Sequence, residues 1–408
     1  MDKVLQQRVK KWINEVFVDQ NWDNFELEFP NYDITGGSIA DMIQVKVIAE
    51  QAGTKTNLDL IIKKSKDSNI AQDTLNLNRA YLNEINMYSK FVPYLRQFAE
   101  ERNSEPFENL PKCFGTIAKE GEYVIILDNL KSKGFKTREL EHSHDMHHTK
   151  LVLEAYAKWH ALCLALRDQK PSVFEEFKHS CKSYLDADSK MFQYLVATVH
   201  KELELVSQIY LERNDSLTAE KLKMLKIRYK DLMEDRMINK NEQYIVIGHG
   251  DCWNNNYLFR YNDIEKNPDK VAVIDWQFGV CGSPLTDVTA YIFSCCSTSE
   301  IERIDEMLQF YYETLSKKLR KLNSDPDKCF SWDICQKSFL RYAPIGIAGM
   351  PMFVKVSCTE KSNNSYDIEQ ATEEGDFSNI FEGKLRDPED YFNKIDGILK
   401  FCIKQNYI

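Results

Sequence analysis

Several features that would assign this protein to an easily recognised class are missing from its sequence. No uninterrupted run of about 18 apolar residues occurs in the 408-residue chain, so we expect no membrane-spanning helix. The first residues, MDKVLQQRVKKWINEVF, lack the apolar core of a secretory signal and predict an amphipathic helix. The 11 cysteines are odd in number and form no Cys-x-x-Cys pair, which is typical of a reducing compartment. We therefore expect a cytoplasmic protein.

An excess of basic residues is also missing. The chain has 63 acidic and 53 basic residues and a formal net charge of −10, which disfavours a nucleic-acid-binding protein. The sequence shows no internal repeat and no low-complexity tract, and no feature that sets an oligomeric state. Because the chain is too long for one minimal core, we expect two lobes.

The first part of the chain predicts a small antiparallel sheet with one helix against it. The β-rich runs Asp41–Glu50 and Asn57–Ser65 are joined by a turn that contains glycine, as in a hairpin. Residues Ala80–Glu101 have helical periodicity, which Pro93 should break or kink. Two further strands, KCFGTIA and EYVIILDNL, follow. We expect an N-terminal lobe over residues 1–130 that ends in a hinge.

The remainder, residues 131–408, predicts a larger and mainly helical lobe. A polar linker is followed by helical periodicity from Thr149 to about Met237. Three short strands come next, in QYIVIGHGD, NYLFRY and KVAVIDWQ, and helices resume at Asp287. The polar segment Thr359–Asp376 is interpreted as an exposed loop. The fold class is therefore α+β.

The stretch VIGHGDCWNNN places an Asp and an Asn on the loop that leaves a short apolar strand. Asp251 and Asn256 lie on this loop, and Asp275 ends the apolar strand of AVIDW. One such Asp can accept the proton of a hydroxyl group, whereas an Asn and a second Asp can hold Mg²⁺ together with phosphate oxygens. The pattern thus predicts half of a phosphoryl-transfer site, the alternative being three unrelated loop residues.

The other half of such a site needs a lysine on a strand and a helical carboxylate that orients it. Lys63 ends the apolar run LIIK, and Glu84 lies on the following helix. Lys64 competes for the role, but alternation along the strand allows only one of the two lysines to face the cleft, and we favour Lys63. Gly36 and Gly37 could cover phosphates with their backbone N–H groups, although an ordinary turn explains the pair equally well.

Four segments carry a resemblance that spans nearly the whole chain. They resemble, in order, the ecdysteroid kinase-like (choline-kinase-like) family, which is similar to aminoglycoside phosphotransferases and choline kinases: LNEINMY, LDNLKSKGF, HGDCWNNNYLF and AVIDWQFGVCGSPLTDV. The His-Gly-Asp-x-Trp-x-x-Asn core is highly specific, whereas the Gly-rich segment is not.

The resemblance implies a protein-kinase-like two-lobed fold and dependence on ATP and Mg²⁺. By that likeness Asp251 is the catalytic base, Asn256 and Asp275 are the Mg²⁺ ligands, and Lys63 and Glu84 form the pair that orients ATP.

The resemblance also implies that residues 126–130 form the hinge, where Asp128 and Leu130 would contact adenine. Asp-Asn stands at 128–129, where the family commonly shows Glu-Asp. The Gly-rich segment departs from the family pattern at 39–41.

Other residues near these motifs have structural interpretations. We interpret His249 as a brace of the loop that carries Asp251, Trp253 as a core residue and His160 as a packed helix residue. Asp287 should bind the backbone of that loop or cap the helix that follows. Four histidines look like a metal site but are interpreted as a solvated segment: His142, His144, His147 and His148.

The acceptor pocket should face Asp251 and be lined by the apolar run Tyr342–Phe353 and by the helix that starts at Asp287. Such a lining suits a lipophilic alcohol, most of all an ecdysteroid-like steroid. One alternative is a choline, ethanolamine or xenobiotic kinase of the same fold. An alternative of another class is a catalytically silent protein that binds an apolar ligand, although such a binder needs none of the four residues Lys63, Asp251, Asn256 and Asp275.

Overall fold

The computed structural model describes most of the chain. The described residues are 3–30, 35–36, 40–66, 74–119, 121–181, 188–238, 244–261, 267–360, 368–375, 377–378 and 383–408. Among them, no helix is both long and apolar enough to cross a membrane.

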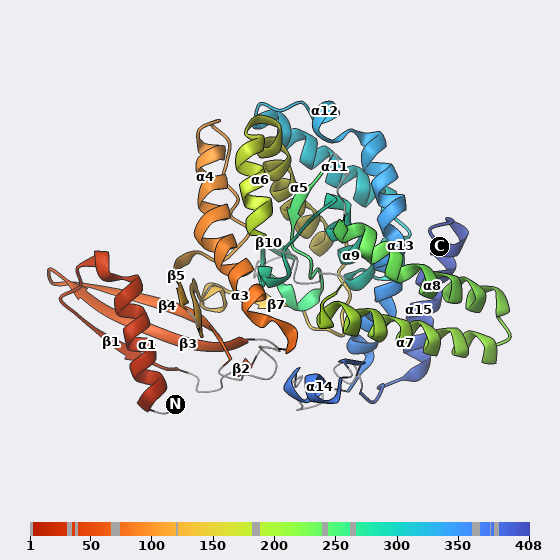
Figure 1. Cartoon of the computed structure of the whole chain (residues 1–408), viewed down its shortest axis with the longest axis horizontal. Helices are drawn as coiled ribbons and strands as arrows, with labels where there is room; N and C mark the ends of the chain where they lie inside the picture. The colour runs from red at the N-terminus through yellow and green to blue at the C-terminus, as the bar shows by residue number, and fades with distance from the viewer. Residues whose placement is uncertain are drawn as a thin grey trace.

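An antiparallel sheet forms the N-terminal part of the molecule (Figure 1). Its strands follow the order β1 (Asn24–Glu28), β3 (Ala40–Gln51), β4 (Thr54–Ser65), β6 (Glu122–Asp128) and β5 (Cys113–Lys119), and β2 (Thr35–Gly36) pairs with β3. The hairpin expected from the first two β-rich runs is confirmed as β3 and β4. Its two-residue loop is Ala52-Gly53, where both residues have positive φ angles, of 47° and 76°. Gly53 adopts such an angle at little cost, which suits a tight hairpin turn.

The two faces of this sheet are covered by different helices. Val124 and Ile126 of β6 belong to a buried cluster with Trp12 of α1 (Lys3–Val16), the helix predicted at the N-terminus. The alternate residues Ile125 and Leu127 pack instead against the segment that contains α3. Alternation along β6 therefore places apolar side chains on both faces of the sheet.

The helix expected at Ala80–Glu101 is present, but its middle is widened. It consists of α3 (Leu77–Asn86), a π-helical turn (Met87–Phe91) and α4 (Val92–Glu100). Pro93 lacks an N–H donor, and its ring would clash with a carbonyl of the preceding α-helical turn. The π-helical turn before Pro93 relieves this conflict and lets the helix continue.

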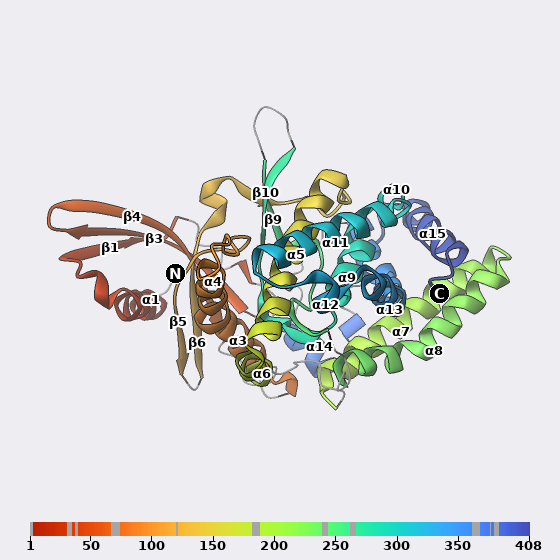
Figure 2. The same cartoon turned by 90° about the horizontal axis from the view of Figure 1, so that it is seen from above.

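The C-terminal part is mainly helical, as predicted. Its helices are α5 (Met146–Gln169), α6 (Pro171–Ser180), α7 (Lys190–Glu212), α8 (Ser216–Ile238), α9 (Pro284–Cys295), α10 (Thr298–Ile301), α11 (Ile304–Lys321), α12 (Pro326–Phe330), α13 (Trp332–Cys358), α14 (Ile368–Glu374) and α15 (Pro388–Lys404). Figure 2 shows the sheet on one side and these helices on the other, with α7 and α8 side by side. The expected α+β fold, a small N-terminal antiparallel sheet followed by a larger and mainly helical part, is confirmed.

Three details of the C-terminal part correct the sequence interpretation. The polar linker contains a strand, β7 (Phe135–Thr137), which pairs with β9 (Tyr257–Tyr261), and β9 also pairs with β10 (Pro268–Val273). A further strand, β11 (Val280–Gly282), pairs with β8 (Val246–Gly248). Helix α14 lies within the segment interpreted as a loop. These elements are too short for hydrophobic periodicity to reveal them.

Candidate active site

The loop between β8 and β9, residues 249–256, carries Asp251 and Asn256 and is called the Asp251 loop. It leaves a buried strand and turns sharply at Gly250, where φ is 82°. A Cβ atom at Gly250 would lie 2.2 Å from the carbonyl oxygen of Phe278. Only glycine fits this turn, which brings the loop against the segment that follows Asp275.

The carboxylate of Asp287 on α9 anchors the start of the Asp251 loop. Its Oδ2 accepts a hydrogen bond from the backbone N–H of His249 at 2.7 Å, and its Oδ1 accepts one from Gly250 at 3.1 Å. Helix α9 is capped instead by Ser283. Of the two roles expected for Asp287, binding of the loop backbone is the one observed. Burial opposes its charge, but the interactions with His160 and His249 hold the pKa of Asp287 well below its usual value.

We expect Asp287→Asn to lower the free energy of unfolding at neutral pH by about 1–3 kcal/mol, because a charge-assisted pair of hydrogen bonds is weakened. Since the folded-state pKa is depressed, this stabilisation exists above the ordinary Asp pKa of about 4 and is lost as pH falls through the folded value. Urea unfolding of both proteins at a series of pH values measures it. A difference that stays constant into acid would contradict the assignment.

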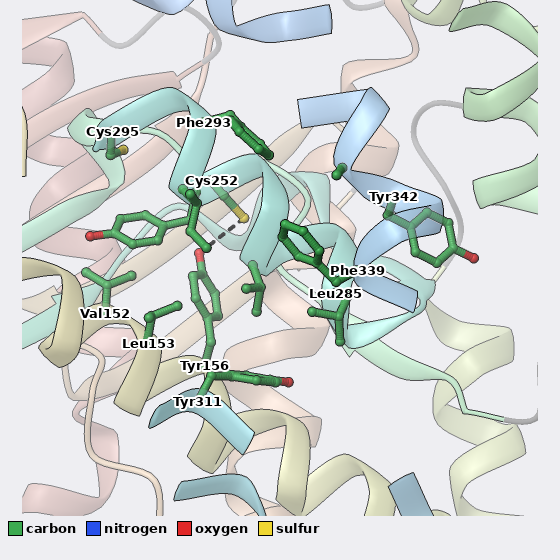
Figure 3. Packing of buried hydrophobic residues seen from close by; sticks show 14 of the residues in the cluster. Val152, Leu153, Tyr156, Cys252, Leu285, Phe293, Cys295, Tyr311, Phe339 and Tyr342 are labelled. Carbon is green, nitrogen blue, oxygen red and sulfur yellow. Dashed lines mark hydrogen bonds between the residues drawn. The ribbon is translucent and has the colours of Figure 1, made fainter. Parts of the chain in front are cut away.

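His249 and Cys252 fix the loop on either side of Asp251. Nδ1 of His249 accepts from the backbone N–H of Asp251 at 3.2 Å, and Nε2 donates to the carbonyl of Ile274 at 2.8 Å. Tyr156 of α5 donates to Cys252 Sγ at 3.2 Å, as Figure 3 shows within the surrounding apolar core. The bracing role expected for His249 agrees with these contacts.

Asp251 and Asn256 face each other across the loop. Nδ2 of Asn256 donates to Oδ2 and to the backbone carbonyl of Asp251, both at 2.8 Å. This arrangement leaves Oδ1 as the Asn256 atom suited to a cation. Burial and the nearby carboxylate of Asp275 raise the pKa of Asp251 to about 6, although His249 and Asn256 act in the opposite direction. A carboxylate with this pKa is a more effective proton acceptor near neutral pH than an ordinary one.

Asp275 follows β10 in a left-handed conformation, with φ of 67°. Its Oδ1 lies 2.5 Å from Nζ of Lys63, and its Oδ2 accepts from Nε2 of Gln277 at 3.2 Å. Lys63 Nζ also lies 2.6 Å from Oε2 of Glu84, which is buried on α3. Desolvation opposes the charge of Lys63, but these two carboxylates outweigh it and raise its pKa. The two halves of the predicted site therefore meet in space.

Lys64 points to the opposite face of β4. Its ammonium group lies 2.8 Å from Oδ2 of Asp41, its cross-strand partner, and also donates to the carbonyl of Ser65. Leu60 and Ile62 on the same face belong to the cluster around α1. Alternation thus gives the two lysines different partners, and Lys63 is the one that contacts Glu84.

We expect Lys63→Ala to raise the KM for ATP or to lower kcat by about 100-fold or more, since it removes a preorganised cation from the phosphates. Lys64→Ala is the matched control: it should lower the unfolding temperature through loss of the pair with Asp41 and leave kcat close to that of the wild type. Steady-state kinetics together with thermal unfolding separate the two effects. If Lys64 were the sensitive residue in the kinetics, the assignment of Lys63 would be wrong.

The remaining nucleotide-binding candidates lie at the ends of strands. Leu130 follows β6 and packs with Leu258 and Ala272. The backbone N–H of Asp128 donates to the carbonyl of Lys112 at 2.9 Å, and its carboxylate pairs with Lys133. Gly36 ends β2 and pairs with β3, whereas Gly37 lies outside the described residues.

The histidine segment is not wholly solvated, which corrects the sequence interpretation. His142 and His147 are exposed, but His144 and His148 are buried. His144 Nε2 lies 2.7 Å from Oδ1 of Asn254 on the Asp251 loop, and its Nδ1 lies 3.0 Å from the hydroxyl of Tyr291. Burial lowers the pKa of His144 to about 3.

His148 has polar partners of its own, within 2.9 Å: the carboxylate of Asp145 and the hydroxyl of Tyr261. His160, in contrast, is packed inside α5 as expected, 2.8 Å from the hydroxyl of Tyr311. Within the described residues, no group of three or more His, Cys, Asp or Glu side chains could hold a metal ion. An Mg²⁺ site built from Asn256 and Asp275 would take its other ligands from phosphate and water.

A cavity of about 290 Å³ opens beside the Asp251 loop, and we call it the Trp253 cavity. Trp253 is only partly buried and lies 5.9 Å from the ring of Phe353, so its assignment to the core was wrong. Five segments of the chain line the Trp253 cavity, and they contribute Leu140, His142, Ser143, Trp253, Asn254, Ser294, Cys295, Cys296, Ser297, Thr298, Ser299, Phe353, Val354, Val356, Ser357, Lys394 and Ile398.

The apolar run Tyr342–Phe353 reaches the Trp253 cavity only at its end. Tyr342 and Met350 are buried inside α13 and belong to the main core, whereas Phe353 lines the cavity. Helix α9 contributes its last turn, at Ser294 and Cys295. The lining residues on α15 and in the segment 140–143 were missed, because no sequence motif marks them.

Comparisons with known proteins agree with the resemblance. The model of the ecdysteroid kinase-like family matches residues 37–324, well over half of the chain. Curated proteins gave no match.

Among solved structures, aminoglycoside 2′-phosphotransferase-IIIa in complex with GDP is 12% identical, covers 98% of this chain and 99% of its own, and has a TM-score of 0.41. A candidate fructosamine-3-kinase from Haemophilus somnus 129PT is also 12% identical, over 82% of this chain and 96% of its own, with a TM-score of 0.29.

Proposed function

The chain belongs to the ecdysteroid kinase-like family, whose members are small-molecule kinases, and from this premise we propose that it transfers the γ-phosphoryl group of ATP to a hydroxyl of a lipophilic alcohol. One observation carries the proposal: Lys63 bridges Glu84 and Asp275, at 2.6 and 2.5 Å. Burial and Asp275 together raise the pKa of Asp251, which suits a proton acceptor. A strand lysine, a helix carboxylate, a strand-end Asp and a loop Asp are thus assembled as phosphoryl transfer requires.

The proposed roles follow from the contacts of each side chain. Asp251 accepts the hydroxyl proton, and Asn256 holds its carboxylate in place. Asn256 and Asp275 would hold Mg²⁺. Mg²⁺ supplies charge neutralisation of the phosphates when it is bound. Lys63 donates to the α- and β-phosphates, and Glu84 keeps its ammonium group in position. Acceleration then comes mainly from positioning and electrostatic stabilisation.

We propose that residues 1–130 form the ATP-binding lobe and residues 131–408 the catalytic lobe. The apolar group of Leu130, Leu258 and Ala272 offers a surface for adenine beneath the hinge at Asp128. Gly36 and Gly37 remain proposed as phosphate cover. A cytoplasmic location is also proposed, supported by 11 cysteines that are all free thiols.

The Trp253 cavity is the proposed acceptor site because it adjoins the Asp251 loop. Trp253 and Phe353 provide apolar surface, and several serine and threonine hydroxyls around them offer hydrogen bonds. This combination suits an ecdysteroid-like polyhydroxysteroid, since burial of its ring surface contributes roughly 25 cal/mol per Å².

The runner-up is a choline, ethanolamine or xenobiotic kinase, for which the two aromatic rings could form part of a cation cage. Against choline, the lining of the Trp253 cavity includes no Asp or Glu among the described residues. A catalytically silent binding protein is disfavoured, because it has no use for a buried lysine that bridges two carboxylates.

We expect a polyhydroxysteroid to be phosphorylated with a KM in the micromolar range and choline and ethanolamine to be poor substrates. The measurement is kcat/KM for each compound in one assay with ATP and Mg²⁺, with mass-spectrometric detection of the phosphorylated product. A ratio that favours the amino alcohols would overturn the steroid assignment and leave the proposed roles of Asp251, Asn256 and Asp275 unchanged.

A further inference from the structure

The described lining of the Trp253 cavity contains a positive charge and no negative charge. Among the described residues of its lining, Lys394 of α15 is the one with a permanent charge and none is a carboxylate, and the side chain of His142 is 62% exposed. The counter-ion of Lys394 is Asp390, one turn earlier on α15, which is half exposed and not part of the lining. The positive end of this ion pair therefore borders the cavity.

The contacts of the Lys394 ammonium group show how it can serve a ligand. Nζ lies 2.8 Å from Oδ2 of Asp390 and 3.6 Å from Sγ of Cys358. An ammonium group has three donors, and these two contacts leave one of them, within the described part of the chain, for an oxygen atom in the cavity. Partial burial opposes the charge, but the hydrogen bond to Asp390 and the nearby thiol outweigh it and raise the pKa of Lys394.

A ligand's own charge then decides how it fits. A cationic ligand would meet the ammonium group of Lys394, and the described part of the lining offers no carboxylate of its own to offset the repulsion. A carboxylate, or the oxygen of a second hydroxyl group, would instead accept a hydrogen bond from the ammonium group.

We propose that Lys394 sets the charge preference of the Trp253 cavity: it selects alcohols that present an anionic group or a second oxygen atom, and it rejects alcohols that carry an amine. The proposal rests on the proposed function, in that the cavity is taken as the acceptor site. It makes Lys394 a specificity-determining residue that takes no part in proton transfer at Asp251.

The test uses three alcohols that share a 4-substituted benzyl alcohol frame and carry an anionic, a neutral or a cationic group: 4-(hydroxymethyl)benzoic acid, 4-(hydroxymethyl)benzamide and 4-(hydroxymethyl)benzylamine. Their dissociation constants are measured by ligand-observed NMR titration for the wild type, Lys394→Gln and Lys384→Gln. Lys384 is the matched control, because its side chain is 80% exposed and paired with Glu360, away from the cavity lining. The double variant Lys394→Gln/Asp390→Asn covers the case in which an unpaired Asp390 disturbs α15.

For the wild type and Lys384→Gln we expect the acid to bind most tightly, then the amide, then the amine. In Lys394→Gln and in the double variant, the preference for the acid over the amine should fall by about tenfold, the effect of a Coulomb interaction worth about 1.4 kcal/mol. An unchanged order in both variants, or an amine that binds the wild type as tightly as the acid does, would overturn the proposal. So would the failure of all three compounds to bind.

Binding is measured without phosphoryl transfer, so this test is separate from that of the proposed function. A protein with the expected order of binding and no kinase activity would keep the role of Lys394 and lose the kinase assignment. A protein that phosphorylates alcohols without regard to their charge would keep the kinase assignment and lose the role of Lys394.

Discussion

Asp251→Asn is expected to lower kcat by about 10²–10⁴-fold, the usual contribution of a positioned general base. The amide has nearly the same shape and keeps an oxygen that can accept from Nδ2 of Asn256, a contact of 2.8 Å in the structure. It cannot take a proton from a hydroxyl group at neutral pH. The measurement is kcat with a steroid alcohol and ATP, together with the affinity for ATP, which should stay close to that of the wild type.

The stability of this variant separates a catalytic role from a structural one. Burial and Asp275 raise the pKa of Asp251 to about 6, so its ionised form costs the folded state free energy above that pH. We therefore expect the unfolding temperature of Asp251→Asn at neutral pH to equal or exceed that of the wild type. Loss of activity accompanied by a lower unfolding temperature would show that Asp251 supports the loop instead of the chemistry.

Asp275→Asn is expected to abolish detectable turnover at ordinary Mg²⁺ concentrations while the fold stays intact. The substitution removes the carboxylate charge that would hold Mg²⁺, and it also removes one of the two carboxylates that contact Lys63. Because Glu84 remains, Lys63 keeps a counter-ion, and the lobe interface should survive. Kinetics across a range of Mg²⁺ concentrations measure the effect.

Asp269→Asn is the matched control for this variant, since Asp269 lies on the same strand, β10, but pairs with Arg260 at the surface. It should behave like the wild type. Normal activity of Asp275→Asn at ordinary Mg²⁺ would contradict the proposed metal site.

Strong alternation and chain order made the N-terminal part predictable. Apolar residues alternate along β3 and β4 and mark the buried face of each strand. Four of them lie in one buried cluster: Val45, Val47, Leu60 and Ile62. The same alternation separates Lys63 from Lys64, so the contact of Lys63 with Glu84 follows from the register of one strand. The position of Pro93 indicated a disturbance of the helix, but not that a π-helical turn would absorb it.

Tertiary packing decided the features that the sequence did not reveal. His144 lies in a polar segment, yet Tyr291 and Asn254 satisfy both of its ring nitrogens inside the protein. The residue type of Trp253 favours the core, but its position on the Asp251 loop leaves one side of the ring open to a cavity. That cavity is assembled from segments as far apart as Leu140 and Ile398, and no local pattern marks residues that meet only in the fold.

The proposed site makes the central claim directly measurable. Purified protein is incubated with Mg²⁺, a polyhydroxysteroid and ATP whose γ-phosphate is isotopically labelled, and the steroid is analysed by mass spectrometry alongside the Asp251→Asn variant. We predict that the wild type transfers the label to one hydroxyl of the steroid and that the variant leaves the steroid unlabelled. Equal labelling by both proteins would contradict the account, because Asp251 would then have no part in the transfer.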